Sequence, residues 1–473
     1  MGGTDIFFWL DAAFYAGAVA CAIHSIMANR TAQGTLAWLM ALFALPYASI
    51  PLYLVFGRRK HIGYAAIRAA QAEVTRKQEV STFLEYEGQG ARHAARELEV
   101  AEDIGGAGYT RGNHVALLED GEETFEEIFS AIDAARSYVL VQFYIFRDDR
   151  LGRTLRDRMA SAVERGVRCY LLYDEIGSIS TPGAYFRSFR EAGVKVAGFG
   201  RRRPIRGRFE VNFRNHRKTV VADGRVAFVG GNNVGVEYVG EDPKFGPWAD
   251  AHMRLEGPLV QAAQLAFSQD WQFAAGEVLE LDWDARPATR GDQIAAFLPT
   301  GPADDLETGM LMFVAAINAA KERLWIVSPY FVPDLAVMSA LKLAVLRGVD
   351  VRVIVPHRPD HLPVWLAGFD FLEEAERAGL RAYRYTRGFM HRKALLIDDD
   401  LAMVGTANMD NRSFRLNFEA MVIVADRGFA RNVEGMFLRD FNGSREHDER
   451  DYQQRSVFFK LAVRAARLLA PVL

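Results

Sequence analysis

Two long apolar stretches open the chain, and the remainder alternates between helical and strand-like patterns. The first stretch runs from about Ile6 to Met27 and the second from about Thr35 to Phe56. About 20 apolar residues of helix cross the hydrocarbon core of a bilayer. The pattern therefore predicts a transmembrane helical hairpin within residues 1–60. A cleaved signal peptide fits poorly, because no basic segment precedes the first stretch and a second follows it.

Polar residues and a proline interrupt these stretches. Asp11 and His24 lie near the ends of the first one, where their side chains can reach the membrane interface. Pro46 lies inside the second, and spanning helices accept proline better than soluble helices do. We therefore expect two spanning helices in spite of the interruptions.

The basic residues beside the apolar stretches predict the orientation. Arg58, Arg59 and Lys60 follow the second stretch directly, whereas the turn between the stretches holds only Arg30. Because cytoplasmic loops carry an excess of Lys and Arg, the bulk of the chain and its N-terminus are expected in the cytoplasm. The basic cluster also suits anionic lipid headgroups.

The remainder of the chain contains a duplication. After a polar, Ala- and Glu-rich segment at 61–111, read as juxtamembrane helix and linker, a helical pattern followed by a strand-like run occurs at 125–146 and again at 312–331. Each is followed by a helix that ends in Arg-Gly-Val, where the glycine is a helix C-terminal signal (Arg165-Gly166-Val167 and Arg347-Gly348-Val349). Alternating helices and apolar strands predict two similar α/β domains, at 112–285 and 286–450.

The C-terminal segment 451–473 mixes apolar and basic residues with helical spacing. It is predicted to be an amphipathic helix. Two interpretations stay open, a helix on the membrane surface and a helix packed on the second domain.

Composition narrows the function classes. A length of 473 residues suggests two or three domains, and a formal net charge of −3 excludes a globally basic nucleic-acid binder. The two cysteines, Cys21 and Cys169, lie in apolar surroundings and suggest neither a disulfide framework nor a Cys-based metal site.

Each repeat carries the same chemical pattern, His-x-Lys-x4-Asp. The copies are His216-Arg217-Lys218 with Asp223 and His391-Arg392-Lys393 with Asp398, and in both an Asn follows ten residues after the Asp (Asn233 and Asn408). One copy would be moderate evidence, but two copies with glycines and Asn at equal offsets are strong evidence. On a strand, His and Lys two positions apart point to one face, and the intervening Arg points to the other.

These residue types suit phosphodiester chemistry. Lysines and asparagines hold the phosphate oxygens, one imidazole attacks phosphorus, and the other protonates the leaving alcohol and then deprotonates the incoming one. We expect one site that contains His216, Lys218, Asp223, His391, Lys393 and Asp398, and that needs neither metal nor cofactor. The pattern does not say which histidine is the nucleophile, and an alternative for Asp223 is a turn former beside Gly224.

Neighbouring residues complete the expected site. Each histidine needs a carboxylate on its far nitrogen, and the candidates are Glu419 for His391 and Asp250 for His216. The alternative for both acids is a solvated surface position. Arg214 is the closest to His216 of a run of arginines and is expected to bind phosphate, although a solvated charged loop is an equal interpretation for the run (Arg201, Arg202, Arg203, Arg206, Arg208 and Arg214).

These residues resemble the phospholipase D superfamily and, within it, the bacterial cardiolipin synthases. The resemblance extends over nearly the whole chain and includes the apolar hairpin, the two His-x-Lys motifs and the segments Gly230-Gly231-Asn232-Asn233 and Gly405-Thr406-Ala407-Asn408. It implies two α/β/α sandwich domains in one chain of a multi-pass inner-membrane protein that acts on phosphatidylglycerol. Glu237 before Tyr238 departs from the acidic pair that is frequent in that family.

The resemblance also implies a reaction and residue roles. A phosphatidyl group would pass from one phosphatidylglycerol to His216, and then to a second phosphatidylglycerol with assistance from His391, giving cardiolipin and glycerol. Lys218, Lys393, Asn233 and Asn408 would bind the phosphate. The alternatives are a phospholipase D-type hydrolase, a nuclease of the same superfamily, and a non-catalytic membrane scaffold. The site would be complete in one chain, and the oligomeric state stays open.

Overall fold

The computed structural model describes residues 3–27, 32–57, 64, 86, 108–200, 212–448 and 452–473. The chain divides into two compact units, residues 1–61 with 200–213 and residues 62–199 with 214–473. Most of the expected juxtamembrane segment 61–111, the basic residues Arg58, Arg59 and Lys60, and the arginines at 201–208 lie outside the described residues.

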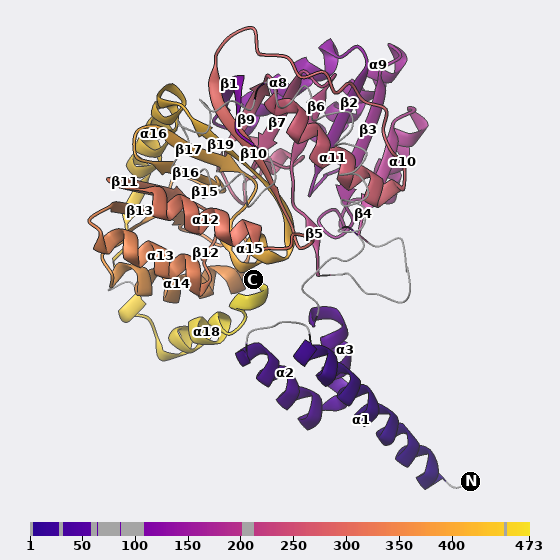
Figure 1. Cartoon of the computed structure of the whole chain (residues 1–473), viewed down its shortest axis with the longest axis vertical. Coiled ribbons are helices and arrows are strands. Elements are labelled where there is room, and N and C mark those ends of the chain that lie inside the picture. Colours follow the sequence, from indigo (N-terminus) through magenta and orange to yellow (C-terminus); the bar gives the residue numbers. More distant parts are fainter. Residues whose placement is uncertain are drawn as a thin grey trace. The chain divides into compact units, whose positions relative to one another are not determined.

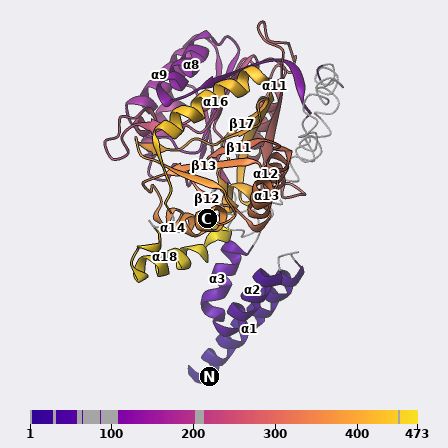
Figure 2. The same ribbon diagram turned by 90° about the vertical axis from the view of Figure 1, so that its left-hand side faces the viewer.

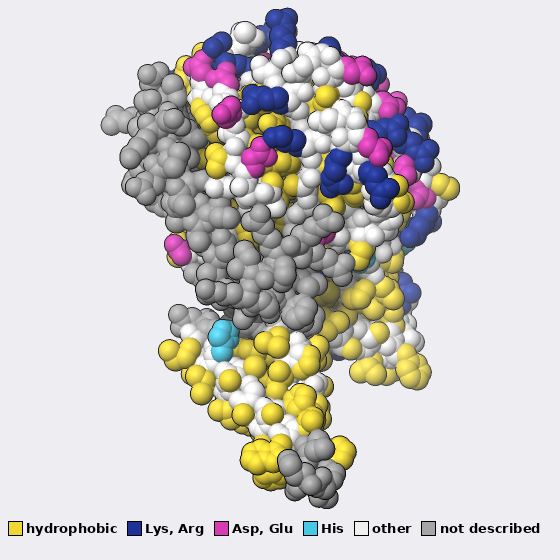
Figure 3. Space-filling view, turned by 90° about the vertical axis from the view of Figure 1, so that its right-hand side faces the viewer, with side chains coloured by type: hydrophobic (Ala, Val, Ile, Leu, Met, Phe, Trp, Pro, Cys, Tyr) yellow, Lys and Arg dark blue, Asp and Glu magenta, His cyan; other side chains and the backbone are white. Residues whose placement is uncertain are grey.

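The first unit contains the apolar helices α1 (Gly3–Met27), α2 (Ala32–Ala44) and α3 (Pro46–Phe56). Residues 7–27 of α1 are long and apolar enough to cross a membrane. Hydrophobic side chains cover these helices (Figure 3). Asp11 and His24 of α1 each have a tyrosine partner, since Tyr47 donates to Asp11 and His24 Nδ1 lies 2.8 Å from the Tyr53 hydroxyl.

The second apolar stretch is two helices rather than the single helix expected. Leu45 separates α2 from α3 with φ −139° and ψ 62°. Proline disfavours helical geometry at the residue before it and has no N–H to donate, so Pro46 ends α2 and begins α3. The Ser49 hydroxyl lies 2.6 Å from the carbonyl oxygen of Ala41 and 2.7 Å from that of Leu45, which gives polar partners to the backbone at this break.

The second unit is built on a 16-stranded sheet with two similar halves (Figure 1). In the first half the strand order is β1, β9, β7, β6, β2, β3 and β4, and in the second it is β10, β19, β17, β16, β11, β13, β14 and β20. The halves meet where β1 pairs antiparallel with β10. Strands β2–β3–β4 and β11–β13–β14 are the parallel sets. The order confirms the duplication.

The bounds of the elements follow the repeat. The first half contains β1 (Thr110–Leu118), α8 (Gly121–Ala134), β2 (Tyr138–Phe143), α9 (Arg150–Glu164), β3 (Arg168–Asp174), α10 (Gly183–Glu191), β4 (Lys195–Phe199), β5 (Arg214–Asn215), β6 (Thr219–Ala222), β7 (Val226–Gly230), the 3-10 helix η2 (Val236–Val239), β8 (Trp248–Ala249), β9 (His252–Glu256) and α11 (Leu259–Ala275). The second contains β10 (Gln293–Thr300), α12 (Thr308–Ala319), β11 (Arg323–Val327), β12 (Phe331–Val332), α13 (Leu335–Leu346), β13 (Asp350–Pro356), α14 (Leu362–Glu376), β14 (Arg381–Tyr385), β15 (Phe389–Met390), β16 (Ala394–Ile397), β17 (Leu401–Gly405), β18 (Met409–Asp410), α15 (Asn411–Arg415), β19 (Asn417–Ala425), α16 (Arg427–Asn442) and β20 (Ser444–Glu446).

Local signals explain where these helices begin and end. Asp149 and Asp334 cap α9 and α13, because their carboxylates accept from backbone N–H groups of the first turn. Both helices are followed by a glycine with left-handed backbone geometry, Gly166 at φ 87° and Gly348 at φ 90°. The glycine signals predicted from the sequence are therefore confirmed as helix ends.

Helices cover both faces of the sheet (Figure 2). In the first half α8, α9 and α10 pack on one face, and in the second α12, α13 and α14 do so. A third hydrophobic cluster joins α11 and α16 to strands of both halves. Two sets of strands therefore share one continuous core.

The C-terminal residues form α18 (Val457–Arg467) and the 3-10 helix η3 (Ala470–Val472). Phe459 packs on Phe369 of α14, and Arg464 and Arg467 form ion pairs with Asp370. Packing on the second domain is therefore the observed arrangement. Phe458, on the other side of α18, is 85% exposed.

Candidate active site

Each motif histidine is held against the opposite repeat. Before His216, β5 pairs in parallel with the start of β19, and the His216 N–H donates to the Phe418 carbonyl oxygen at 2.9 Å. Before His391, β15 pairs in parallel with β8, and the His391 N–H donates to the Ala249 carbonyl oxygen at 2.8 Å. The two repeats therefore exchange short strands, and both histidines belong to one site.

The exchange determines which carboxylate orients which histidine. His216 Nδ1 lies 2.9 Å from Glu419 Oε2, and His391 Nδ1 lies 2.6 Å from Asp250 Oδ2. Both carboxylate side chains are 0% exposed. The expected pairs, Glu419 with His391 and Asp250 with His216, were wrong. The partners are crossed because each acid follows the strand segment that pairs with the opposite repeat.

Both carboxylates are stabilised in their ionised form. Burial alone would raise the pKa of Asp250, but His391, Lys393 and the Ala251 N–H outweigh it and bring the pKa to about 2. Burial likewise opposes ionisation of Glu419, whose pKa is nevertheless lowered by His216 and Lys218 and by the Thr406 hydroxyl. An ionised carboxylate only accepts hydrogen bonds, so each histidine donates from Nδ1 and keeps its lone pair on Nε2.

Burial holds both imidazoles in the neutral form. It lowers the pKa of His216 to about 4, although Glu419 acts in the opposite direction. It lowers the pKa of His391 as well, with Lys393 adding to the effect and Asp250 opposing it. The side chains keep 12% and 10% of their surface exposed. A neutral imidazole with an accessible Nε2 is competent as a nucleophile or as a base.

The lysines lie beside the histidines of their own motifs. Lys218 Nζ donates to the His216 carbonyl oxygen at 2.6 Å, and Lys393 Nζ donates to that of His391. Burial lowers the pKa of Lys218 to about 7 and that of Lys393 to about 8. Because an ammonium has three donors, these bonds leave further N–H groups for an anion. A bound phosphate would favour their protonated forms.

The motif arginines point to the other face of the strands, as predicted. Arg217 forms an ion pair at 2.9 Å with Asp270 of α11, and Arg392 forms one at 3.0 Å with Asp440 of α16. All four side chains are buried. Each motif therefore forms a buried ion pair with the corresponding helix of its own half, α11 or α16.

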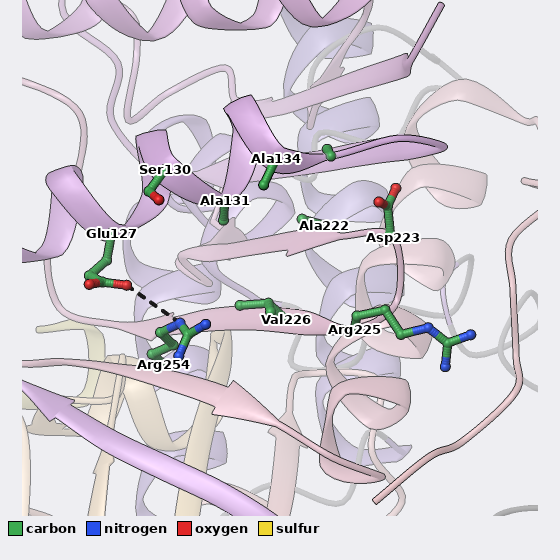
Figure 4. Close-up of a pocket in the computed structure, with 10 residues that line it drawn as sticks. Glu127, Ser130, Ala131, Ala134, Ala222, Asp223, Arg225, Val226 and Arg254 are labelled. Atoms are coloured by element: carbon green, nitrogen blue, oxygen red, sulfur yellow. Dashed lines mark ion pairs between the residues drawn. The ribbon is translucent and has the colours of Figure 1, made fainter. Parts of the chain in front are cut away.

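The motif aspartates do not reach the histidines, and their expected catalytic role is corrected. Asp223 lies at the far end of β6 and accepts from the backbone N–H groups of residues 136–138 at 2.8–2.9 Å. Asp398 does the same for residues 321–323 at 2.9–3.3 Å. Both have positive φ, 53° and 50°. They are turn formers, which was the alternative interpretation of Asp223. Figure 4 shows Asp223 at a pocket with Arg225 and Val226, and the pocket lining contains neither histidine.

Glycines allow the carboxylates to approach. A Cβ on Gly231 would lie 1.9 Å from Asp250 Oδ1, and one on Gly405 would lie 2.3 Å from the Ala420 carbonyl oxygen. The Gly231 N–H already donates to the Ala251 carbonyl oxygen. The glycines therefore make room for the strands that carry the acids.

The asparagines and Arg214 lie around the histidines. The Asn233 side chain accepts from the Ile145 N–H at 3.1 Å and interacts with Tyr238, whose ring centroid lies 6.4 Å from that of His391. Asn408 is buried and bonds to Asp410. Arg214 bonds to Tyr144. Their role in phosphate binding stays a prediction.

Several neighbours of the histidines were not predicted. The Tyr144 ring packs edge-on against His216 with centroids 5.0 Å apart, and Trp248 lies 5.1 Å from His391. Tyr144 follows β2 directly, and Tyr330 lies three residues after β11. The sequence signal for both tyrosines is their place in the loop that follows the first parallel strand of each half.

Comparisons with known proteins find relatives along nearly the whole chain. A family model described as "Cardiolipin synthase, PLD-like domain" matches residues 128–242 and 313–441, and one described as "Phospholipase_D-nuclease N-terminal" matches residues 16–58. Cardiolipin synthase A of Pseudomonas putida strain F1 is 43% identical over 96% of this chain and 96% of its own length. Cardiolipin synthase A of Pseudomonas aeruginosa PAO1 is 45% identical over 96% of this chain and 93% of its own length.

A solved structure shares the fold. Phosphatidylserine synthase of Haemophilus influenzae Rd KW20 superposes with a TM-score of 0.61 at 13% identity, covering 80% of this chain and all of that one. At this identity the likeness extends to the fold alone.

Proposed function

We propose a reaction for this chain on one premise: it belongs to the cardiolipin synthase family of the phospholipase D superfamily. The chain is a phosphatidyltransferase that makes cardiolipin. In our proposal it transfers a phosphatidyl group from one phosphatidylglycerol to a second and releases glycerol, through a phosphohistidine on His216.

The crossed pairs His216–Glu419 and His391–Asp250 are the observation that carries this proposal. These pairs support a site in which both histidines carry a lone pair on Nε2. A lysine ammonium group, of Lys218 or Lys393, lies beside each histidine. A phosphodiester needs a nucleophile on one side, a proton donor on the other, and positive charge on its oxygens.

The first step forms the covalent intermediate. His216 Nε2 attacks phosphorus, the bond from phosphorus to the glycerol oxygen breaks, and protonated His391 gives that oxygen its proton. Burial lowers the pKa of His391, but the anionic substrate acts in the same direction as Asp250 and favours the protonated form.

The second step regenerates the site. His391, now neutral, takes the proton of a hydroxyl on the second phosphatidylglycerol. The alkoxide oxygen attacks phosphorus, the bond from phosphorus to His216 Nε2 breaks, and cardiolipin leaves. Lys218, Lys393, Asn233, Asn408 and Arg214 bind the phosphate in both steps, and Glu419 and Asp250 hold the imidazoles in orientation.

The membrane segment is proposed to span the bilayer twice. α1 forms the first span, and α2 with α3 forms a second that bends at Pro46. The basic residues 58–60 support a cytoplasmic location for the catalytic part, by the positive-inside rule. The proposed domains are 112–285 and 286–450, with the active site complete in one chain and the bilayer as the source of both substrates.

Product analysis tests the proposed function. The full-length chain, reconstituted in vesicles that contain phosphatidylglycerol, is expected to produce cardiolipin and glycerol in equal amounts. Phosphatidic acid without cardiolipin would overturn the proposal in favour of a hydrolase. The double variant His216→Ala/His391→Ala, purified in parallel, should produce neither cardiolipin nor phosphatidic acid. That result excludes a contaminating enzyme as the source of the products.

A further inference from the structure

The two halves of the site carry different charges around their histidines. The two halves can be compared directly, because the duplication surrounds His216 and His391 with corresponding elements. Tyr144 lies in the loop after β2 and Tyr330 in the corresponding loop after β11, but Tyr144 bonds to Arg214 whereas the Tyr330 hydroxyl donates to Asp360 Oδ2 at 2.6 Å. One tyrosine therefore holds a cation and the other holds an anion.

The half around His216 is cationic. Arg214 and Arg412 lie close enough to act on one another, since burial and then the charge of Arg214 lower the pKa of Arg412. The nearby acid, Asp174, is engaged by the backbone N–H groups of Ile176, Gly177 and Asn215 at 2.8–2.9 Å. This half is suited to an anionic phosphate.

The half around His391 contains Asp360, a carboxylate that accepts from one backbone N–H group, whereas Asp174 accepts from three. Asp360 lies in the loop after β13, and its charge acts on both His391 and Lys393. Asp360 Oδ1 accepts from the His361 N–H at 2.7 Å, and Oδ2 accepts from Tyr330. Trp248 and Tyr238 provide aromatic surface beside the same imidazole, at 5.1 and 6.4 Å between ring centroids.

A carboxylate in this position cannot serve the phosphate, because two anions repel at short range. Its two oxygens have about four lone-pair positions, and two of them are used by Tyr330 and His361. The remaining capacity suits a donor such as a hydroxyl group. In the proposed reaction the group beside His391 is the glycerol, which keeps two free hydroxyls while its third oxygen leaves phosphorus.

We propose that Asp360 and Tyr330 form the headgroup subsite, in which the Asp360 carboxylate accepts a hydrogen bond from a free hydroxyl of glycerol. The leaving glycerol occupies it in the first step and the glycerol of the acceptor lipid in the second. The subsite rests on the proposed function and deepens it, since it selects polyol headgroups and orients the ester oxygen toward His391. Asp360 is a specificity-determining residue and Tyr330 holds it in position.

Two donors that differ only in the headgroup test the subsite. The full-length chain is given vesicles of phosphatidylglycerol or of phosphatidyl-1-propanol, whose headgroup has no free hydroxyl, and the release of glycerol or of 1-propanol is measured in a single turnover. Wild type is expected to prefer phosphatidylglycerol. Asp360→Asn is expected to reduce that preference by roughly tenfold or more, the usual effect of losing a hydrogen bond to a charged acceptor. Release of 1-propanol should change little.

The ratio of the two rates separates recognition from other roles. If Asp360 acts only by fixing its loop or by raising the pKa of His391, Asp360→Asn lowers both rates by one factor, and that result overturns the inference. Asp157→Asn is the matched control, because Asp157 is an exposed carboxylate on α9 paired with Arg156. It should leave both rates unchanged.

Tyr330→Phe provides a second variant if Asp360→Asn does not fold. It removes the hydroxyl that holds Asp360, so the preference should fall by a smaller factor, and an unchanged preference would overturn the inference. Failure of the proposed function is recognised separately, because wild type would then make no cardiolipin from phosphatidylglycerol. Wild type that makes cardiolipin beside variants with unaltered preference refutes the subsite alone.

Discussion

His216 donates its Nδ1 hydrogen to Glu419, which lies 203 positions further along the chain in the opposite repeat. The equivalent bond joins His391 to Asp250, 141 positions earlier. Neither repeat therefore holds a complete His–carboxylate pair by itself. Each histidine of the proposed reaction therefore depends on an acid from the other repeat.

Replacing either acid should impair the histidine that it orients. Glu419→Gln keeps the shape of the side chain but no longer fixes the tautomer of His216, so formation of the phosphatidyl-enzyme should slow by about 10²- to 10⁴-fold. Rapid-quench measurement of the first glycerol released checks this. Asp250→Asn is the matched variant and should impair proton transfer to the leaving alcohol through His391. Normal adduct formation by folded Glu419→Gln would contradict the assignment.

The nucleophile can be identified by trapping the adduct. Incubation with phosphatidylglycerol labelled in its acyl chains, followed by denaturation at neutral or alkaline pH, should leave an acid-labile label on wild type. His216→Ala should abolish the label, because no other group attacks phosphorus in our proposal. His391→Ala keeps the nucleophile and serves as the comparison. Persistence of the label in His216→Ala would assign the attack to His391.

The motif aspartates should affect stability rather than chemistry. Asp223 accepts three backbone N–H groups, so Asp223→Asn should cost about 1–3 kcal/mol of unfolding free energy. Asparagine also tolerates the positive φ of this position, which isolates the effect of the carboxylate. Denaturant unfolding in detergent measures the loss, and kcat per folded molecule should be unchanged. A tenfold lower kcat in folded Asp223→Asn would restore a catalytic role.

The lysines predict the basic limb of the pH profile. They bind phosphate when protonated, and burial lowers the pKa of Lys218 to about 7 and that of Lys393 to about 8. Positive charge is present below these values and is lost above them, so kcat/KM should fall as the pH rises through about 7–8. Lys218→Arg should move the limb upward, because a guanidinium stays protonated. A flat kcat/KM up to pH 10 would contradict this interpretation.

The limb in kcat should lie at higher pH than the limb in kcat/KM. The pH dependence of kcat reports pKa values of the enzyme–substrate complex, and that of kcat/KM reports pKa values of the free enzyme. A bound phosphate favours the ammonium forms and raises the pKa of both lysines. Coincident limbs would mean that the phosphate does not contact Lys218 or Lys393.

The sequence by itself determined the duplication, the reactive residues and the apolar N-terminus. His and Lys lie on one face of a strand and Arg on the other because side chains alternate along β-structure, and Gly166 and Gly348 end helices because they tolerate left-handed geometry. These are local properties, and a pattern of neighbouring residues is sufficient to predict them.

Only the tertiary structure decided which residues meet. Because β5 and β15 each pair with a strand of the opposite repeat, Glu419 lies beside His216 and Asp250 beside His391. No local pattern records which strand edge a two-residue segment will join. The same applies to Asp223, since three backbone N–H groups of another segment donate to its carboxylate, and to Asp360, which accepts from Tyr330 of a separate loop. Periodicity fixes the face of a residue, but the long-range pairing of strands fixes its partners.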